Sequence, residues 1–204
     1  MPPVITANDI PSHGLLEVVT GTIVTPAACD LARERGVQLV ERPAGMLQTK
    51  SDPAKLVAIG SDHGGFRMKE ALKPVLLELG FVPLDVGVNS EQPADYPDIA
   101  EKVAEAVARN KAFQGVVIDG AGIGSCMAAN KVPGIRAALC YDRASARNSR
   151  EHNAANVLTL GGRLLTLSQA EEVLRTWIAT PYAGGRHQTR IDKISALEKK
   201  YSKV

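Results

Sequence analysis

The sequence is poor in aromatic residues and nearly balanced in charge. Aromatic side chains make up 4% of its 204 residues, and the formal net charge is +2. A chain without a basic surplus has no strong electrostatic attraction to nucleic acid or to an anionic membrane surface. Its few aromatics form no run on which single-stranded bases could stack. We therefore expect neither nucleic acid nor a membrane as a partner.

Long apolar runs and closely spaced cysteines are missing as well. No apolar stretch reaches the length of a membrane span, and the N-terminus has no basic-then-apolar signal pattern. Cys29, Cys126 and Cys140 are an odd number at no metal-ligand spacing. The sequence therefore predicts a cytoplasmic protein without a metal site. A hydrophobic content of 45% is ordinary for a globular chain that buries a core.

The most informative stretch is a strand, turn and helix pattern at residues 116–125. Three apolar residues precede Asp119, and glycines follow at positions 120, 122 and 124. This pattern predicts a buried parallel strand, a tight loop and the start of a helix. Glycine lets backbone N–H groups approach a ligand without an intervening Cβ. Gly120, Gly122 and Gly124 are therefore candidates to hold a phosphate or the oxyanion of an enediolate.

Two other interpretations of these glycines stay open. They could serve only the tight packing of a strand against a helix. They could also form a dinucleotide-binding turn, because Asp142 follows the next expected strand. The spacing is G-x-G-x-G rather than G-x-G-x-x-G, and the loop does not follow the first strand of its domain, which argues against NAD.

From Leu56 onward the chain alternates between strand and helix patterns. This rhythm predicts an α/β fold with a doubly wound parallel five-stranded sheet, a Rossmann-like three-layer αβα arrangement. Pro83 favours an outer position for its strand, and Pro74 either kinks its helix or marks the first turn. Expected strands are at residues 56–60, 82–86, 116–119, 136–141 and 156–160, and expected helices at 66–79, 99–109, 142–151, 167–178 and 188–201.

Residues 1–54 differ from the rest and are expected to form an N-terminal extension and linker, with the main domain at residues 55–204. Residues 16–24 alternate loosely and predict a strand or a hairpin. Thr25 and Pro26 read as the N-cap and first residue of a short helix that ends at Gly36. We expect this unit to be too small to carry a core of its own.

In a parallel sheet, the loops after the strands share one crevice. This gathers Asp62, His63, the glycine loop and Arg163. His152 and Asn153 end a helix just before a strand, so they belong to the opposite edge of their own sheet. We therefore expect an active site shared between two subunits.

Several of these residues also have plain structural interpretations. Asp62 before a helix is often only a cap. The arginines at 143, 147 and 150 fall on one helical face, which usually means a solvated stripe. Arg186 and Arg190 lie four residues apart and can point the same way, which suits bidentate phosphate binding but also surface ion pairs.

Longer motifs are shared with a known family. They are Gly60-Ser-Asp-His-Gly-Gly-Phe66, Asp95-Tyr-Pro97, Gly120-Ala-Gly-Ile-Gly124, Ala128-Ala-Asn-Lys131, Pro133-Gly-Ile-Arg136, Glu151-His-Asn153 and Gly185-Arg-His-Gln-Thr-Arg190. In this collinear order the chain resembles, over about residues 55–200, the B-type ribose-5-phosphate isomerases, whose family includes galactose-6-phosphate isomerase subunits.

The resemblance implies an aldose–ketose isomerase that needs no cofactor or metal, acts on a sugar phosphate such as ribose 5-phosphate, and forms a homodimer or a dimer of dimers with shared sites. It implies that His152 opens the sugar ring and that Asp62 contacts the ring oxygens. His63, Arg186 and Arg190 match the phosphate-binding residues, and Asn153 matches a residue that contacts sugar hydroxyls. The glycine loop with Ser125 completes the expected substrate-binding set.

The expected base is where the chain departs from the family. One branch has a cysteine where this chain has Asp119, and another has a glutamate where it has Ser125. Asp119 is the natural substitute, because a partly buried carboxylate is a competent base for enediol chemistry. Cys126 is the second candidate, although its helix is expected to pack inward. The alternative function is a sugar-phosphate-binding or microcompartment cargo or scaffold protein that has kept the pocket and lost the base.

The extension also resembles other proteins. Residues 7–11 and 21–27 are similar to stretches in proteins of bacterial microcompartment operons. This resemblance implies that residues 1–50 dock to a microcompartment shell or cargo partner, so that the enzyme is either cytoplasmic or encapsulated.

Overall fold

The structure is a computed structural model that describes residues 4–12, 15–42 and 55–202. The chain divides into two compact units, residues 1–51 and 52–204. The end of the expected extension and linker, residues 43–54, lies outside the described residues.

The described part of the first unit contains short strands, a 3-10 helix and an α-helix. Its sheets are two-stranded and parallel, pairing β1 with β3 and β2 with β4. The expectation of a hairpin is therefore wrong, because the strands at residues 15–24 pair with partners elsewhere in the unit. The elements are β1 (Val4–Ile5), the 3-10 helix η1 (Ala7–Asp9), β2 (Leu15–Val19), β3 (Ile23–Val24), α1 (Pro26–Glu34) and β4 (Gln38–Arg42).

This unit has a small core of its own, contrary to the sequence-based expectation. Ile10, Ala28, Ala32 and Val37 are buried together. They meet because the apolar face of α1 packs against residues of both sheets. Thr25 caps the start of this helix, as expected. This core forms because short strands that are distant in the sequence pair in parallel and pack against the helix. The local periodicity of the sequence does not reveal such pairing.

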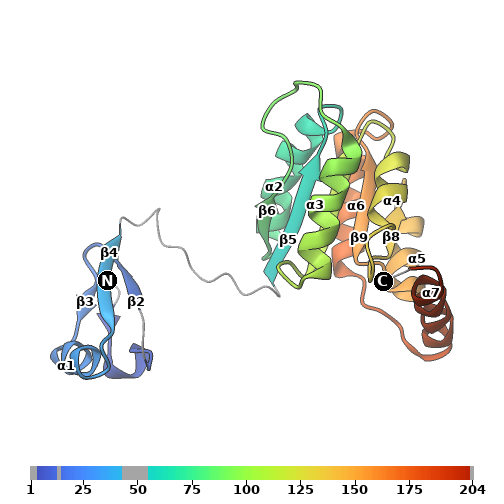
Figure 1. The fold of residues 1–204 in the computed structure, drawn as a ribbon. Coiled ribbons are helices and arrows are strands. Elements are labelled where there is room, and N and C mark those ends of the chain that lie inside the picture. Colours follow the sequence, from blue (N-terminus) through green and yellow to red (C-terminus); the bar gives the residue numbers. More distant parts are fainter. Residues whose placement is uncertain (1–3, 13–14, 43–54, 203–204) are drawn as a thin grey trace. The chain divides into compact units, whose positions relative to one another are not determined.

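The second unit is the expected α/β fold. All neighbouring strands of its sheet are parallel, in the order β6-β5-β7-β9-β8 (Figure 1). The strands are β5 (Leu56–Ser61), β6 (Val82–Asp85), β7 (Gln114–Asp119), β8 (Ala137–Leu139) and β9 (Val157–Gly161). The helices are α2 (Phe66–Glu78), α3 (Tyr96–Ala108), α4 (Ile123–Ala129), α5 (Arg143–Asn153), α6 (Leu167–Ala179) and α7 (Gln188–Tyr201), with the 3-10 turn η3 (Gly185–His187) before the last.

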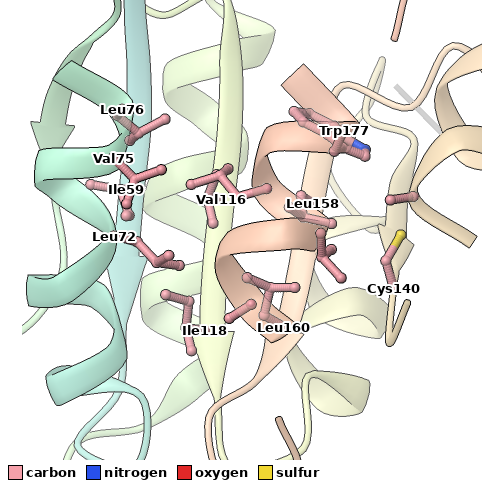
Figure 2. Packing of buried hydrophobic residues seen from close by; sticks show 14 of the residues in the cluster. Ile59, Leu72, Val75, Leu76, Val116, Ile118, Cys140, Leu158, Leu160 and Trp177 are labelled. Atoms are coloured by element: carbon pink, nitrogen blue, oxygen red, sulfur yellow. The ribbon is translucent and has the colours of Figure 1, made fainter. Parts of the chain in front are cut away.

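Helices cover both faces of this sheet. The larger core lies on the face covered by α2, α5 and α6, where side chains of these helices meet alternate residues of β5, β7 and β9 (Figure 2). The other face packs against α3 and α4. β7 is buried along its whole length because it lies at the centre of the sheet.

The two prolines have different outcomes. Among the described strands, β6 pairs only with β5, so the prediction of an outer strand from Pro83 is confirmed. Pro74 lies inside α2 rather than in its first turn, which excludes the second of the two alternatives. Among the described helices, none is both long and apolar enough to cross a bilayer.

Candidate active site

The loops after β5, β7 and β9 meet at the carboxyl edge of the sheet. The Asp62 amide donates to the Ile118 carbonyl at 3.2 Å, and the Gly162 amide donates to the Asp119 carbonyl at 2.7 Å. These bonds extend the parallel ladders by one residue beyond the strands. They place the three loops side by side as the floor of one crevice, as the topology predicts.

Asp62 acts as a cap within this crevice. One carboxylate oxygen, Oδ1, accepts hydrogen bonds from the amides of Gly64 at 2.8 Å and Gly65 at 3.1 Å. The side chain therefore fixes the turn that leads into α2. Within the described part of the chain, Oδ2 has no hydrogen-bond partner.

His63 is held by a loop from the other side of β5. The Ala94 amide donates to His63 Nδ1 at 3.3 Å. A backbone amide only donates, so Nδ1 must be the accepting nitrogen and Nε2 carries the proton of the neutral ring.

Asp119 is almost completely buried, with 5% of its surface exposed. Oδ1 accepts from the amides of Ala121, at 2.8 Å, and Gly122. Oδ2 accepts from the Ser125 amide at 2.9 Å and the Ser125 hydroxyl at 2.6 Å. The carboxylate therefore caps the turn with both oxygens, which is the structural role that aspartate often takes in such loops.

The three glycines of the loop serve different needs. Gly122 has a φ of 78°, and a Cβ there would lie 2.8 Å from the backbone of Leu160. A Cβ on Gly124 would lie 2.5 Å from the ring of Tyr96. These two glycines permit close packing, whereas a Cβ on Gly120 would meet only the Arg163 side chain at 3.6 Å. The packing interpretation therefore applies to Gly122 and Gly124, whereas packing does not account for Gly120.

Backbone donors are available in this loop. Among the described residues, the amides of Gly120, Ile123 and Gly124 have no hydrogen-bond acceptor. Unpaired amides in a tight loop are suited to holding an oxyanion.

The two residues after the loop face inward. Ser125 is fully buried and donates twice to Asp119, so its contacts are with the base candidate rather than with an open crevice. The Cys126 thiol donates to the Ala137 carbonyl of β8 at 3.4 Å. This agrees with the expectation that the helix of Cys126 packs inward.

Arg163 is a residue whose role the sequence did not reveal. It is exposed, and its side chain passes over the glycines of two loops: a Cβ on Gly64 would lie 3.5 Å from Arg163 Nε. No described acidic side chain forms an ion pair with it. The topology of a parallel sheet predicts Arg163 at the crevice, and the packing shows that its side chain lies next to Gly64 and Gly120.

A second cluster gathers most of the other predicted residues. The His152 and His187 rings are stacked, with centroids 4.2 Å apart and planes at 8°. Asn148 Nδ2 lies 2.9 Å from His152 Nδ1, which orients that ring. A cavity of about 390 Å³ is lined by Asn148, His152, Asn153, Arg186, His187 and Arg190.

Two arginines and two histidines line this cavity, so positive charge gathers in it. Desolvation, together with the positive charge of His152, Arg186 and Arg190, lowers the pKa of His187 below its ordinary value of 6.5. A phosphate would relieve that repulsion, because it supplies the missing negative charge. His187 is not identifiable from the sequence, since a lone histidine is uninformative until its stacking partner is known.

The two clusters belong to opposite edges of the sheet. α5 starts at the carboxyl end of β8 and ends, with His152, before the amino end of β9. Figure 1 shows the end of α5 and all of α7 away from the loops after β5 and β7. One chain therefore brings Asp62, His63 and Asp119 together in one place and His152 and Arg186 in another.

Known proteins share this fold and sequence. Residues 57–194 match the family model described as Ribose/Galactose Isomerase. The ribose-5-phosphate isomerase B of Escherichia coli is 42% identical over 146 residues, covering 72% of this chain and 98% of that protein. A putative sugar phosphate isomerase of Bacillus subtilis is 45% identical over 145 residues, covering 71% and 97%.

Solved structures agree with these relatives. The ribose-5-phosphate isomerase B of Clostridium thermocellum is 48% identical, with a TM-score of 0.71, over 72% of this chain and 99% of that one. The Mycoplasma genitalium enzyme, solved with bound ribulose 5-phosphate, is 40% identical, with a TM-score of 0.68, over 71% and 97%. The chain therefore belongs to the ribose/galactose isomerase family.

Proposed function

We propose that this chain interconverts ribose 5-phosphate and ribulose 5-phosphate, or a closely similar aldose and ketose phosphate, through an enediolate. The observation that carries the proposal is the crevice where Asp62, His63 and the glycine loop converge with unpaired backbone donors. Family membership supports the same reaction class.

The reaction moves one proton and one carbonyl. His152 opens the sugar ring, after which a base takes the proton from C2 of the aldose. The C–H electron pair then forms the C1–C2 double bond, and negative charge moves to the carbonyl oxygen. The amides of Gly120, Ile123 and Gly124 are the proposed donors to that oxygen. Return of the proton to C1, together with transfer of the O2 hydroxyl proton to O1, forms the C2 carbonyl and gives the ketose.

Asp119 is the proposed base, and it can act as one only if one of its present hydrogen bonds is released. A base needs a lone pair that faces the substrate, whereas all four donors to Asp119 occupy its oxygens. Three of them are backbone amides that cannot turn. The Ser125 hydroxyl is the one donor that can rotate away, so it is the group that would free a lone pair on Oδ2.

The substrate phosphate is proposed to lie between hydrogen-bond donors from both clusters. His63 and Arg163 lie at the crevice, and Arg186 and Arg190 line the cavity on the other edge. Because one chain separates these groups, we propose a homodimer, alone or in a dimer of dimers, in which each site takes His152, Asn153 and the two arginines from a neighbour. Ile123 and Met127 of α4, 45% and 65% exposed beside the glycine loop, are suited to such an interface.

A second candidate function has one observation in its favour. With both oxygens of Asp119 engaged in capping, the chain could bind a sugar phosphate without reacting, as a carrier or scaffold. The deciding measurement is exchange of the C2 proton with deuterium oxide, using a panel of four-, five- and six-carbon aldose phosphates. Exchange and ketose formation with one of them supports the isomerase. Binding without exchange on the whole panel supports the carrier.

Neither a metal nor a nucleotide has a role in this proposal. Within the described ranges, no three histidine, cysteine or acidic side chains form a cluster that could hold a metal ion. For the extension, the proposal is that it directs a cytoplasmic enzyme to a microcompartment shell or cargo partner.

A further inference from the structure

A lysine is completely buried between α2 and β6. The Lys69 side chain has no exposed surface, and its Nζ lies 2.5 Å from Asp85 Oδ2 and 2.8 Å from Glu70 Oε1. The ring of Phe66 lies 5.4 Å from the ammonium. Apolar residues of similar volume often stabilise a fold as well as a buried ion pair does. Stability alone therefore does not account for a lysine at this position.

The ion pair between Lys69 and Asp85 lies at the start of the loop that follows β6, residues 86–95. The second oxygen of Asp85, Oδ1, accepts from the Gly87 amide at 3.0 Å. The Val88 amide donates to the Ser61 carbonyl at 3.2 Å. A Cβ on Gly87 would lie 2.5 Å from the Ser61 nitrogen. The start of the loop therefore packs closely against Ser61, the residue that precedes Asp62 and His63.

The far end of the same loop returns to His63. Ala94 donates its amide to Nδ1 of that ring, as described above, and Glu91 in between pairs with Arg67 of α2. The loop therefore contacts residues 61–63 at both of its ends. Its last contact decides which imidazole nitrogen carries the proton.

We propose that Lys69 is a positioning residue that acts through Asp85 and loop 86–95 to hold His63 as an Nε2–H donor toward the substrate phosphate. The inference rests on the proposed function for the identity of the ligand, but the state of the His63 ring can be measured without any substrate. The ammonium fixes Asp85, Asp85 fixes Gly87, and the loop carries Ala94 to the ring.

The test compares Lys69→Met with Lys73→Met in the full chain. Lys73 Nζ also contacts Asp85 Oδ2, at 3.0 Å, and is 27% exposed. Each variant therefore leaves Asp85 paired with one ammonium, but only Lys69→Met removes the buried one. The chain has four histidines, so long-range nitrogen–proton NMR spectra of histidine-labelled protein are simple, and His63→Gln assigns the ring of interest.

We expect Lys69→Met to mix the two tautomers of His63 and to raise KM for the sugar phosphate about tenfold with little change in kcat, because a donor to a charged group is misplaced. Lys73→Met should keep the single tautomer and the original KM. An unchanged His63 spectrum and KM in folded Lys69→Met would overturn the proposal, as would equal changes in both variants.

Asp85→Asn provides the same test if Lys69→Met does not fold, because it weakens the link between Lys69 and Gly87. An unchanged His63 tautomer in that variant would again contradict the role. If the parent protein turns over no sugar phosphate, the proposed function fails, while the spectra still decide whether Lys69 sets the state of His63.

Discussion

Asp119 is the residue on which the proposed chemistry depends, and four donors surround its carboxylate. Asparagine in its place can offer only one accepting oxygen. Its NH₂ group would face an amide that also donates, so Asp119→Asn cannot keep all of the turn hydrogen bonds. This substitution therefore tests both basicity and capping.

We expect Asp119→Asn to lower kcat by a factor of about 10² to 10⁴ and also to lower Tm, since a buried donor is left unpaired. Ser125→Ala is the matched control, because it removes the rotating hydroxyl and leaves the carboxylate in place. If Asp119 is the base, the kcat of Ser125→Ala should stay within about tenfold of that of the parent. Equal losses of kcat in both variants would assign Asp119 to capping. Near-normal turnover of Asp119→Asn would make Cys126→Ser the next substitution.

His187 provides a second test at this scale. Its pKa lies below the ordinary value because of desolvation and of the positive charge of His152, Arg186 and Arg190. A phosphate in the cavity offsets that charge, so the pKa should rise and more of the ring should be protonated at a given pH. An NMR titration with and without inorganic phosphate measures this change. A pKa of His187 that is unaffected by saturating phosphate would place the phosphate elsewhere.

At the scale of elements, α2 and β6 are joined by a charge cluster that also makes a prediction about pH. Burial raises the pKa of the Asp85 carboxyl, but hydrogen bonds from Lys69, Lys73 and the Gly87 amide outweigh it and hold the pKa below 3.8. Hydrogen bonds from the same two lysines lower the pKa of Glu70 below 4.5. Both carboxyls thus bind protons less readily in the folded chain than in the unfolded one.

The cluster should therefore stabilise the fold fully above about pH 4.5, and that contribution should be lost as the pH falls through the folded-state pKa values. Urea unfolding between pH 6 and pH 3 measures it, and Asp85→Asn should show a shallower decline in the free energy of unfolding. The same slope in the variant and the parent would show that these pairs contribute nothing.

The three arginines on one face of α5 have different surroundings in the folded chain. Arg150 lies over the ring of Trp177, with Cζ 5.1 Å from the centroid, and donates to the carbonyls of Ala155 at 2.5 Å and Thr180 at 3.3 Å. The interpretation of a fully solvated arginine stripe is therefore wrong at its last member. Burial next to Arg136 also lowers the pKa of Arg150.

At the scale of the whole molecule, the separation of the two clusters predicts complementation between subunits. A mixture of Asp119→Asn and His152→Ala chains, refolded together, forms mixed dimers in which one site is fully intact. Activity should rise from that of the single variants to about a quarter of the parent, the share expected for random pairing. A mixture no more active than its components would place each complete site within one chain.

The extension gives the last prediction. The family match begins at residue 57, and the first unit has its own core, so removal of residues 1–50 should leave a folded isomerase with unchanged kcat. Assembly state or cellular placement should change instead, as shown by light scattering and by imaging of a tagged chain. Loss of folding or of dimer formation on truncation would make the extension part of the core fold.

The sequence by itself determined the order and type of the elements in the second unit. Alternating apolar runs and helical patterns set β5 to β9 and their helices, and Pro83 identified the outer strand, because these signals are local. The rule that loops share the carboxyl edge of a parallel sheet was enough to bring Asp62, His63 and Asp119 together.

Only the tertiary structure decided how these groups are used. The donors to Asp119, the stacking of His187 on His152, the approach of Arg163 to Gly64 and the core of the first unit all depend on contacts between segments that no local pattern records. Hydrogen bonding and close packing act between residues that are distant in the chain. They determine which side chains are already engaged in hydrogen bonds and which remain able to face a ligand.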